Sequence, residues 1–163
     1  MNEASGVYNM YISSSLRLNS YDAVSFVKAF EKECVDVAAR LNVPIENILG
    51  LAAQESQYGK GRIARDLKNY FSMHAPAPLQ IGSEHPKENR KIKVAKFSRF
   101  RDCAESFERR FGHAVKGKAD PLVFAQALVA VRFNTGRAED GGRANFIPYL
   151  VDIIRAVKGR LSC

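Results

Sequence analysis

The chain is poor in cysteine and has no long apolar segment. Its cysteines are Cys34, Cys103 and Cys163, an odd and sparse set without the spacing of metal ligands. Cys34 and Cys103 could pair in an oxidising compartment, but free thiols are the favoured expectation. No apolar run approaches the ~18 residues that a membrane-spanning helix needs. These absences argue against a disulfide scaffold and predict a chain without a membrane span.

Metal and nucleotide motifs are missing as well. The histidines His74, His85 and His113 are scattered, and the spacings His-x-x-x-His and Cys-x-x-Cys do not occur, which argues against a zinc site. Neither the phosphate loop Gly-x-x-x-x-Gly-Lys-Ser/Thr nor the dinucleotide motif Gly-x-Gly-x-x-Gly is present. The sequence therefore predicts no metal and no cofactor.

Basic residues are in clear excess. Lys and Arg number 25 and Asp and Glu 17, which gives a net charge of +8 over 163 residues. This length predicts one domain. The charge favours a polyanionic partner, whether nucleic acid, anionic lipid or an acidic cell-wall polymer. A basic surface without a partner is the alternative.

The first residues differ in character from the rest. Residues 1–19 form a polar leader, and the domain is expected over 20–163. The stretch from Met1 to Leu16 has neither a basic n-region nor a long apolar core, so it does not read as a secretory signal peptide. We expect a protein that is made in the cytoplasm without such a signal.

Apolar residues recur at three- and four-residue steps in the first half of the chain, which predicts amphipathic helices. The first is expected over 21–41, capped by Ser20 or Asn19. The second is expected to begin at Pro44, which suits a first helical position, and to run to about Gln57.

A less regular region follows. Three prolines between residues 62 and 90 predict an irregular segment there. The alternation over 91–94 indicates a strand. Its expected partner lies near Leu79 and Ile81, so a small hairpin with a long tip is predicted.

Helices are expected again in the last third. Asp102 and Asp120 are predicted N-caps, and Pro121 suits a first helical turn. A glycine-containing loop is expected over 134–145, and Pro148 should open the last helix. The predicted fold class is α+β, mostly α.

Glu55 is the candidate catalytic residue. In the second predicted helix it lies at the edge of the apolar stripe, in the last turn, above Leu51 and Ala52. Apolar shielding and the negative end of the helix dipole both raise the pKa of a carboxyl group. A carboxyl that stays protonated near neutral pH can serve as a general acid, as cleavage of a glycosidic bond requires. The alternative is a glutamate that simply points into water.

Three segments in order carry a resemblance to a known family. Residues 52–60, AAQESQYGK, resemble the catalytic-helix motif of the glucosaminidase family, a lysozyme-like branch that cleaves bacterial peptidoglycan. Residues 69–73, NYFSM, resemble the Asn-Leu-Phe-Gly-Ile of that family, with Ser72 in place of glycine. Residues 96–107 resemble its strand end and following helix. The likeness covers about 45–161 and implies a lysozyme-like fold with a small β-hairpin lobe and Glu55 as the acid.

The same resemblance implies a second carboxylate on the hairpin. Here Glu84 and Glu88 are level candidates for the base that activates water on the opposite face of the sugar. A mobile hairpin tip can bring such a group in when substrate binds. The alternative is that both are solvated loop charges.

Residues that could bind the glycan come from three parts of the chain. Aromatic rings can stack on sugars, although Phe71 fits the core equally well. Phe133 stands where the resembled family has a tyrosine, and Tyr149 is a substitute for it. The stretch 134–136 is similar to the Tyr-Asn-x-Gly of lytic transglycosylases and goose-type lysozymes. The full set of candidates is Gln57, Tyr58, Asn69, Tyr70, Phe71, Phe133, Asn134 and Tyr149.

The functional hypothesis is a glucosaminidase-type hydrolase of peptidoglycan glycan strands. A lytic transglycosylase or a muramidase on the same polymer remains open, as does a glycan-binding module without activity. A nucleic-acid binder is disfavoured, and a monomer is expected. A wall hydrolase without a signal peptide needs a dedicated secretion machine or release by phage lysis. If it is injected as a toxin into rival bacteria, it acts in their periplasm or cell wall, and an immunity protein should cover the Glu55 groove.

Overall fold

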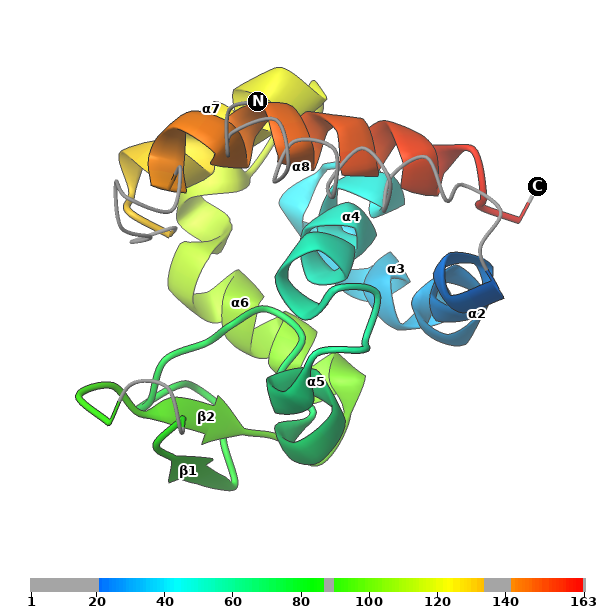
Figure 1. The fold of residues 1–163 in the computed structure, drawn as a ribbon. Coiled ribbons are helices and arrows are strands. Elements are labelled where there is room, and N and C mark those ends of the chain that lie inside the picture. Colours follow the sequence, from blue (N-terminus) through cyan, green and yellow to red (C-terminus); the bar gives the residue numbers. More distant parts are fainter. Residues whose placement is uncertain (1–20, 87–89, 134–141, 163) are drawn as a thin grey trace, which may run out of the picture.

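The protein is mostly helical, with a small two-stranded sheet at one end (Figure 1). The structure is a computed structural model and describes residues 21–86, 90–133 and 142–162. The predicted leader, 1–19, lies outside the described residues. The predicted fold class, α+β and mostly α, is confirmed. The elements in chain order are α2 (Tyr21–Phe30), the 3-10 helix η1 (Lys32–Cys34), α3 (Val35–Leu41), α4 (Ile45–Ser56), α5 (Arg62–Leu67), β1 (Gly82–Glu84), β2 (Val94–Lys96), α6 (Phe100–Val115), α7 (Pro121–Ala130) and α8 (Gly142–Lys158).

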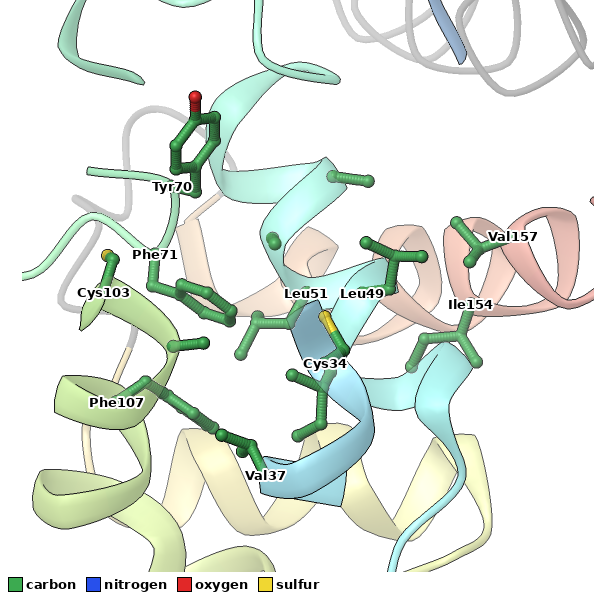
Figure 2. Close-up of a cluster of buried hydrophobic side chains, with 14 of the residues drawn as sticks. Cys34, Val37, Leu49, Leu51, Tyr70, Phe71, Cys103, Phe107, Ile154 and Val157 are labelled. Carbon is green, nitrogen blue, oxygen red and sulfur yellow. The ribbon is translucent and has the colours of Figure 1, made fainter. Parts of the chain in front are cut away.

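Helix α4 lies at the centre of the molecule. Figure 1 shows α8 crossing over it, α2 and α3 to one side and α6 to the other. Its middle is entirely buried, from Asn47 to Ala53. The apolar stripe predicted from the sequence lies in this core, where Leu49 and Leu51 face residues of α8 and α6 (Figure 2). A helix enclosed on all sides gives the end of α4 a fixed position, and Glu55 stands at that end.

Gly50 allows α4 and α8 to approach closely. A Cβ atom on Gly50 would lie 2.7 Å from Cγ1 and 3.0 Å from the Cα of Ile154. We expect Gly50→Ala to lower the free energy of unfolding by about 1–3 kcal/mol, because overpacking at a backbone contact outweighs the gain in helix propensity. Chemical denaturation measures this.

Gly112→Ala is the matched control for that prediction. It is also a helical glycine, but the new Cβ would meet only the end of the flexible Leu41 side chain, 2.8 Å away. That side chain can shift, so the loss should be smaller than for Gly50→Ala. Equal losses at the two sites would contradict the proposed backbone contact.

The β lobe is a hairpin of two short strands with one added bridge. Strands β1 and β2 are antiparallel, with Gly82 opposite Lys96 and Glu84 opposite Val94. On its other side, β2 meets the segment from Met73 to Ala75 through a bridge between His74 and Val94. The hairpin was predicted, but both strands lie about two to three residues later in the chain than expected.

Several predicted boundaries are wrong. Asp102 was the expected N-cap of α6, but the helix begins at Phe100 and its N-cap is Arg99. The helix expected over 21–41 is divided into α2, η1 and α3. The segment after 62 is not irregular throughout, because α5 occupies Arg62–Leu67. Pro148 does not open the last helix but lies inside α8, which begins at Gly142. The earlier start is stabilised by Phe146, whose side chain is buried in the turn before Pro148. The cap at Asp120 is confirmed, since its carboxylate accepts a hydrogen bond from the Val123 N–H.

Candidate active site

Glu55 occupies the last turn of α4, at the edge of the core. The helix ends at Ser56, and Gln57 turns the chain out through the left-handed region with a φ of 52°. The Tyr58 N–H donates to the carbonyl of Ala53 at 2.8 Å, which closes the helix end. The Glu55 side chain is half-buried. The carboxyl group is therefore held by a rigid helix end rather than by a loop.

Ser56 explains why a serine follows the glutamate in this motif. Its side chain is buried, and its hydroxyl donates to the carbonyl of Ala52 at 2.6 Å. The same oxygen accepts from the Gly59 N–H at 2.9 Å. Gly59 has a φ of 79°, and a Cβ there would lie 3.3 Å from the Phe26 ring, so other residues are disfavoured. These bonds fix the turn beside Glu55.

Burial changes the acidity of Glu55. Removal of the carboxylate from water raises the pKa of Glu55 from 4.5 to about 7. No charge among the described residues adds to this shift, so desolvation alone accounts for it. At neutral pH a large fraction of the group keeps its proton, which is the form that a general acid needs.

The two candidates for the second carboxylate lie on the β lobe or beyond the described residues. Glu84 ends β1, and its side chain is exposed. Glu88 lies outside the described part of the chain. Glu84 therefore belongs to a different lobe from Glu55. The position of the hairpin determines where the Glu84 carboxylate lies.

Asn69 is a buried residue that hydrogen-bonds to several segments of the chain. It is 2% exposed, and its Nδ2 donates to the carbonyls of Met73 and Ala95 at 2.9 and 2.8 Å. Its Oδ1 accepts from the Met73 N–H at 2.9 Å. Its Oδ1 also accepts from the Cys103 thiol of α6 at 3.7 Å. These bonds join the β lobe to the helical body, and contact of Asn69 with substrate stays a prediction.

Phe71 and Tyr70 belong to the aromatic core. Phe71 is fully buried and stacks on Phe107, with 5.2 Å between ring centroids; Figure 2 shows it inside the cluster. Tyr70 packs against Phe30 and Phe100, with centroids at 4.9 and 5.0 Å. Only its hydroxyl end points away from the cluster (Figure 2). Phe71 lies inside the core and Tyr70 at its edge, with 9% of the residue exposed. Stacking on sugars stays a prediction for both.

The remaining binding candidates are scattered. Gln57 is exposed directly after α4. Tyr58 is 9% exposed, packs edge-on against Phe26 and lies under the guanidinium of Arg160, 5.8 Å from the ring centroid. Phe133 is half-buried against Phe111. Asn134 lies outside the described residues. Tyr149 is 9% exposed, in α8.

Two residues of interest escaped the sequence interpretation. Gln54, next to Glu55, has a buried Oε1 that accepts no hydrogen bond from the described residues. Arg110 of α6 donates to two carbonyls at the base of the β lobe. A glutamine or an arginine on a helix gives no signal in one sequence, because both usually face solvent.

The described ranges contain neither a cluster of metal ligands nor a helix that could span a membrane. Within 21–86, 90–133 and 142–162, no group of three or more His, Cys, Asp or Glu side chains could hold a metal ion. No helix in these ranges is long and apolar enough to span a bilayer.

Cys34 and Cys103 are both buried and free, as the sequence favoured.

Comparisons with solved structures find close similarity in fold. One chain of a type VI secretion system effector–immunity complex from Pseudomonas protegens is 57% identical, with a TM-score of 0.80, and the match covers 90% of this chain and 99% of that one. A peptidoglycan hydrolase from Sphingomonas sp. A1 is 20% identical, with a TM-score of 0.69 and coverage of 85% and 92%. The glycoside hydrolase domain of Salmonella typhimurium FlgJ is 22% identical, with a TM-score of 0.56 and coverage of 84% and 98%. No family model and no curated protein matches the chain.

The helical body, the small hairpin and the half-buried glutamate at the end of the central helix define a lysozyme-like protein. The chain belongs to the glucosaminidase family of that superfamily. This confirms the resemblance that the motifs at 52–60 and 69–73 carried.

Proposed function

We propose that the protein is a glycoside hydrolase that cleaves the glycan strands of bacterial peptidoglycan, with Glu55 as the general acid. The observation that carries the proposal is the half-buried carboxyl at the end of α4, whose pKa is raised to about 7 by burial. A fold shared with peptidoglycan hydrolases supports the substrate class. A glycan-binding module without activity has no need of a desolvated carboxylic acid.

The proposed reaction uses two carboxyl groups, one on each side of the glycosidic bond. Glu55 gives its proton to the glycosidic oxygen as the bond between that oxygen and the anomeric carbon breaks. The anomeric carbon develops positive charge and is attacked by water, whose proton passes to Glu84. Glu55 leaves the step as a carboxylate and Glu84 as an acid, and exchange with solvent restores both.

The family supports cleavage after N-acetylglucosamine, and the products test it. Purified peptidoglycan is digested with wild type and with Glu55→Gln, and the fragments are identified by mass spectrometry. A reducing N-acetylglucosamine end supports the proposal. A reducing muramic acid end would assign a muramidase instead. Release of nothing by wild type from several wall types would reject the enzyme and favour the binding module.

The exposure of Glu84 favours a second candidate reaction, that of a lytic transglycosylase. Glu84, the described candidate for the base, is exposed at the end of β1. A lytic transglycosylase needs no such group, because the C6 hydroxyl of muramic acid attacks internally. That reaction would give an anhydro end in the same digest.

Glu84→Gln separates the two mechanisms. If Glu84 activates water, we expect this variant to lose about 10²–10⁴-fold in kcat, the range typical of a general base. The rate of release of soluble fragments measures it, with Glu105→Gln on α6 as a control outside the hairpin. Full activity of Glu84→Gln would exclude Glu84 as the base and favour Glu88 or the internal route.

The similarity to a chain of a secretion-system effector–immunity complex suggests a biological role for this protein. We infer that this chain is an antibacterial effector that acts on the cell wall of a target cell and is neutralised in its producer by an immunity protein. The support is the 57% identity to one chain of an effector–immunity complex. An immunity protein that blocks access to Glu55 should inhibit the digest at a stoichiometry of one to one.

A further inference from the structure

The β lobe is attached to the helical body chiefly through its inner strand. Strand β2 is hydrogen-bonded to Asn69, whose Nδ2 donates to the Ala95 carbonyl at 2.8 Å. The Ala95 N–H also donates to the Met73 carbonyl at 3.0 Å. Strand β1 lies on the far side of β2, at the edge of the molecule (Figure 1). The strand that carries Glu84 therefore depends on β2 and on the turn that precedes it.

Arg110 holds the start of that turn. From the middle of α6, its Nη1 donates to the carbonyl of His74 at 2.9 Å. Its Nη2 donates to the carbonyl of Pro76. A guanidinium presents its donors in a fixed planar fork, so these two bonds set both position and orientation. Helix α6 is itself anchored in the core by Phe107, which is fully buried.

The turn transmits this position to β1 through two further hydrogen bonds. The Ala77 N–H donates to Oε1 of Gln80 at 2.8 Å, which closes the turn. The Ile81 N–H donates to the Lys96 carbonyl at 2.8 Å. Residues 82–84 then form β1. A continuous series of bonds thus runs from Arg110 to the strand that ends in Glu84.

We propose that Arg110 is a positioning residue that fixes the outer strand of the β lobe, and with it Glu84, against the helical body. This inference rests on the proposed function, because it assigns Glu84 to the reaction. Without the two bonds, β1 stays paired with β2 but its turn is free to move. A displacement of about 1 Å in a catalytic group can cost about 100-fold in rate.

Three variants test the inference: Arg110→Met, Arg110→Lys, and Arg109→Met as the control. Arg109 precedes Arg110 on α6 and is exposed. Hydrogen exchange is measured at the amides of Ala77 and Ile81, and at Leu51 in the core. The kcat and KM are measured on soluble peptidoglycan oligosaccharides. Thermal unfolding checks the fold of each variant.

We expect Arg110→Met to speed exchange at Ala77 and Ile81 at least about tenfold and to leave Leu51 unchanged. Its kcat should fall about 10–100-fold, with KM within about threefold, and Arg110→Lys should recover part of kcat. Arg109→Met should match wild type. Unchanged exchange in Arg110→Met would overturn the anchoring, and faster exchange with wild-type kcat would overturn the positioning role. If wild type itself has no activity on peptidoglycan, the proposed function fails and the role of Arg110 fails with it, whereas the exchange data still report the anchor.

Discussion

Replacement of Glu55 by glutamine is expected to lower kcat by at least about a thousandfold while making the folded protein more stable at pH 8. The amide cannot give a proton to the glycosidic oxygen, so general-acid catalysis is lost. It also carries no charge, so its burial avoids the desolvation cost that the carboxylate pays. A residue kept for stability alone would show the opposite pattern, with stability falling together with activity.

The sign of the stability change follows from the two pKa values. In the folded state the pKa of Glu55 is about 7, against 4.5 for the unperturbed group. Below pH 4.5 the group is protonated in both states, and its contribution is fully present. As pH rises from 4.5 to about 7, the unfolded chain releases the proton first, so wild type loses stability through that window. The loss amounts to roughly 3 kcal/mol by pH 8, because one pKa unit corresponds to about 1.4 kcal/mol.

Denaturant unfolding at pH 4 and pH 8 measures this difference. Glu55→Gln should match wild type at pH 4 and exceed it at pH 8. The rate of peptidoglycan digestion by wild type should fall as pH rises through about 7, because the acid form is consumed. Glu46→Gln, in the first turn of the same helix, is the control for both measurements. Equal stability of wild type and Glu55→Gln at pH 8 would show that Glu55 is not desolvated.

Asn69→Ala is expected to cost about 2–5 kcal/mol of unfolding free energy and most of the activity. Removal of the amide leaves the Met73 N–H and the Ala95 carbonyl without the partners that they have in the structure. A buried polar group without a partner costs about 1–3 kcal/mol. Because these groups lie where the β lobe joins the body, the lobe should loosen before the helices unfold. Denaturant titration and hydrogen exchange at Ala95 measure the two effects.

Asn47→Ala is the matched control. Asn47 is also a buried amide, and its Nδ2 donates to the carbonyls of Lys118 and Ala119 at 3.3 and 3.0 Å. These bonds join α4 to the segment before α7, away from the β lobe. We expect Asn47→Ala to lose stability but to keep wild-type kcat at temperatures where it is folded. If Asn69→Ala also keeps its kcat, the lobe does not depend on this amide.

Local chemistry made much of the fold predictable. The pair Asp120-Pro121 marks the start of α7 because cap and first-turn residues act within four positions of each other. The apolar stripe of α4 and the place of Glu55 at its edge follow from helical periodicity in the same way. Local signals failed at two places, because α6 begins at Phe100, before Asp102, and α8 begins at Gly142, before Pro148.

The errors arose where distant contacts decide. Helix α5 has six residues and buries only Ala64 and Leu67, so its periodicity is too short to detect. The strand register is set by Asn69 and by the His74–Val94 bridge, which no alternation pattern reveals. The packing of the Tyr70 ring against Phe30 from α2 and Phe100 from α6 was likewise not foreseen. No local pattern reports which helix will lie over a given side chain.

The two buried thiols have a consequence for the conditions under which the protein can work. Cys34 and Cys103 are 0% exposed, and burial raises the pKa of both, that of Cys103 to about 12. A thiol that is both protonated and inaccessible reacts slowly with disulfides or oxidants. Neither thiol forms a disulfide in the fold. Formation of the core around them therefore does not require oxidation of these cysteines. The core formed by these helices can assemble under reducing conditions and persist unchanged under oxidising ones, without help from a disulfide isomerase.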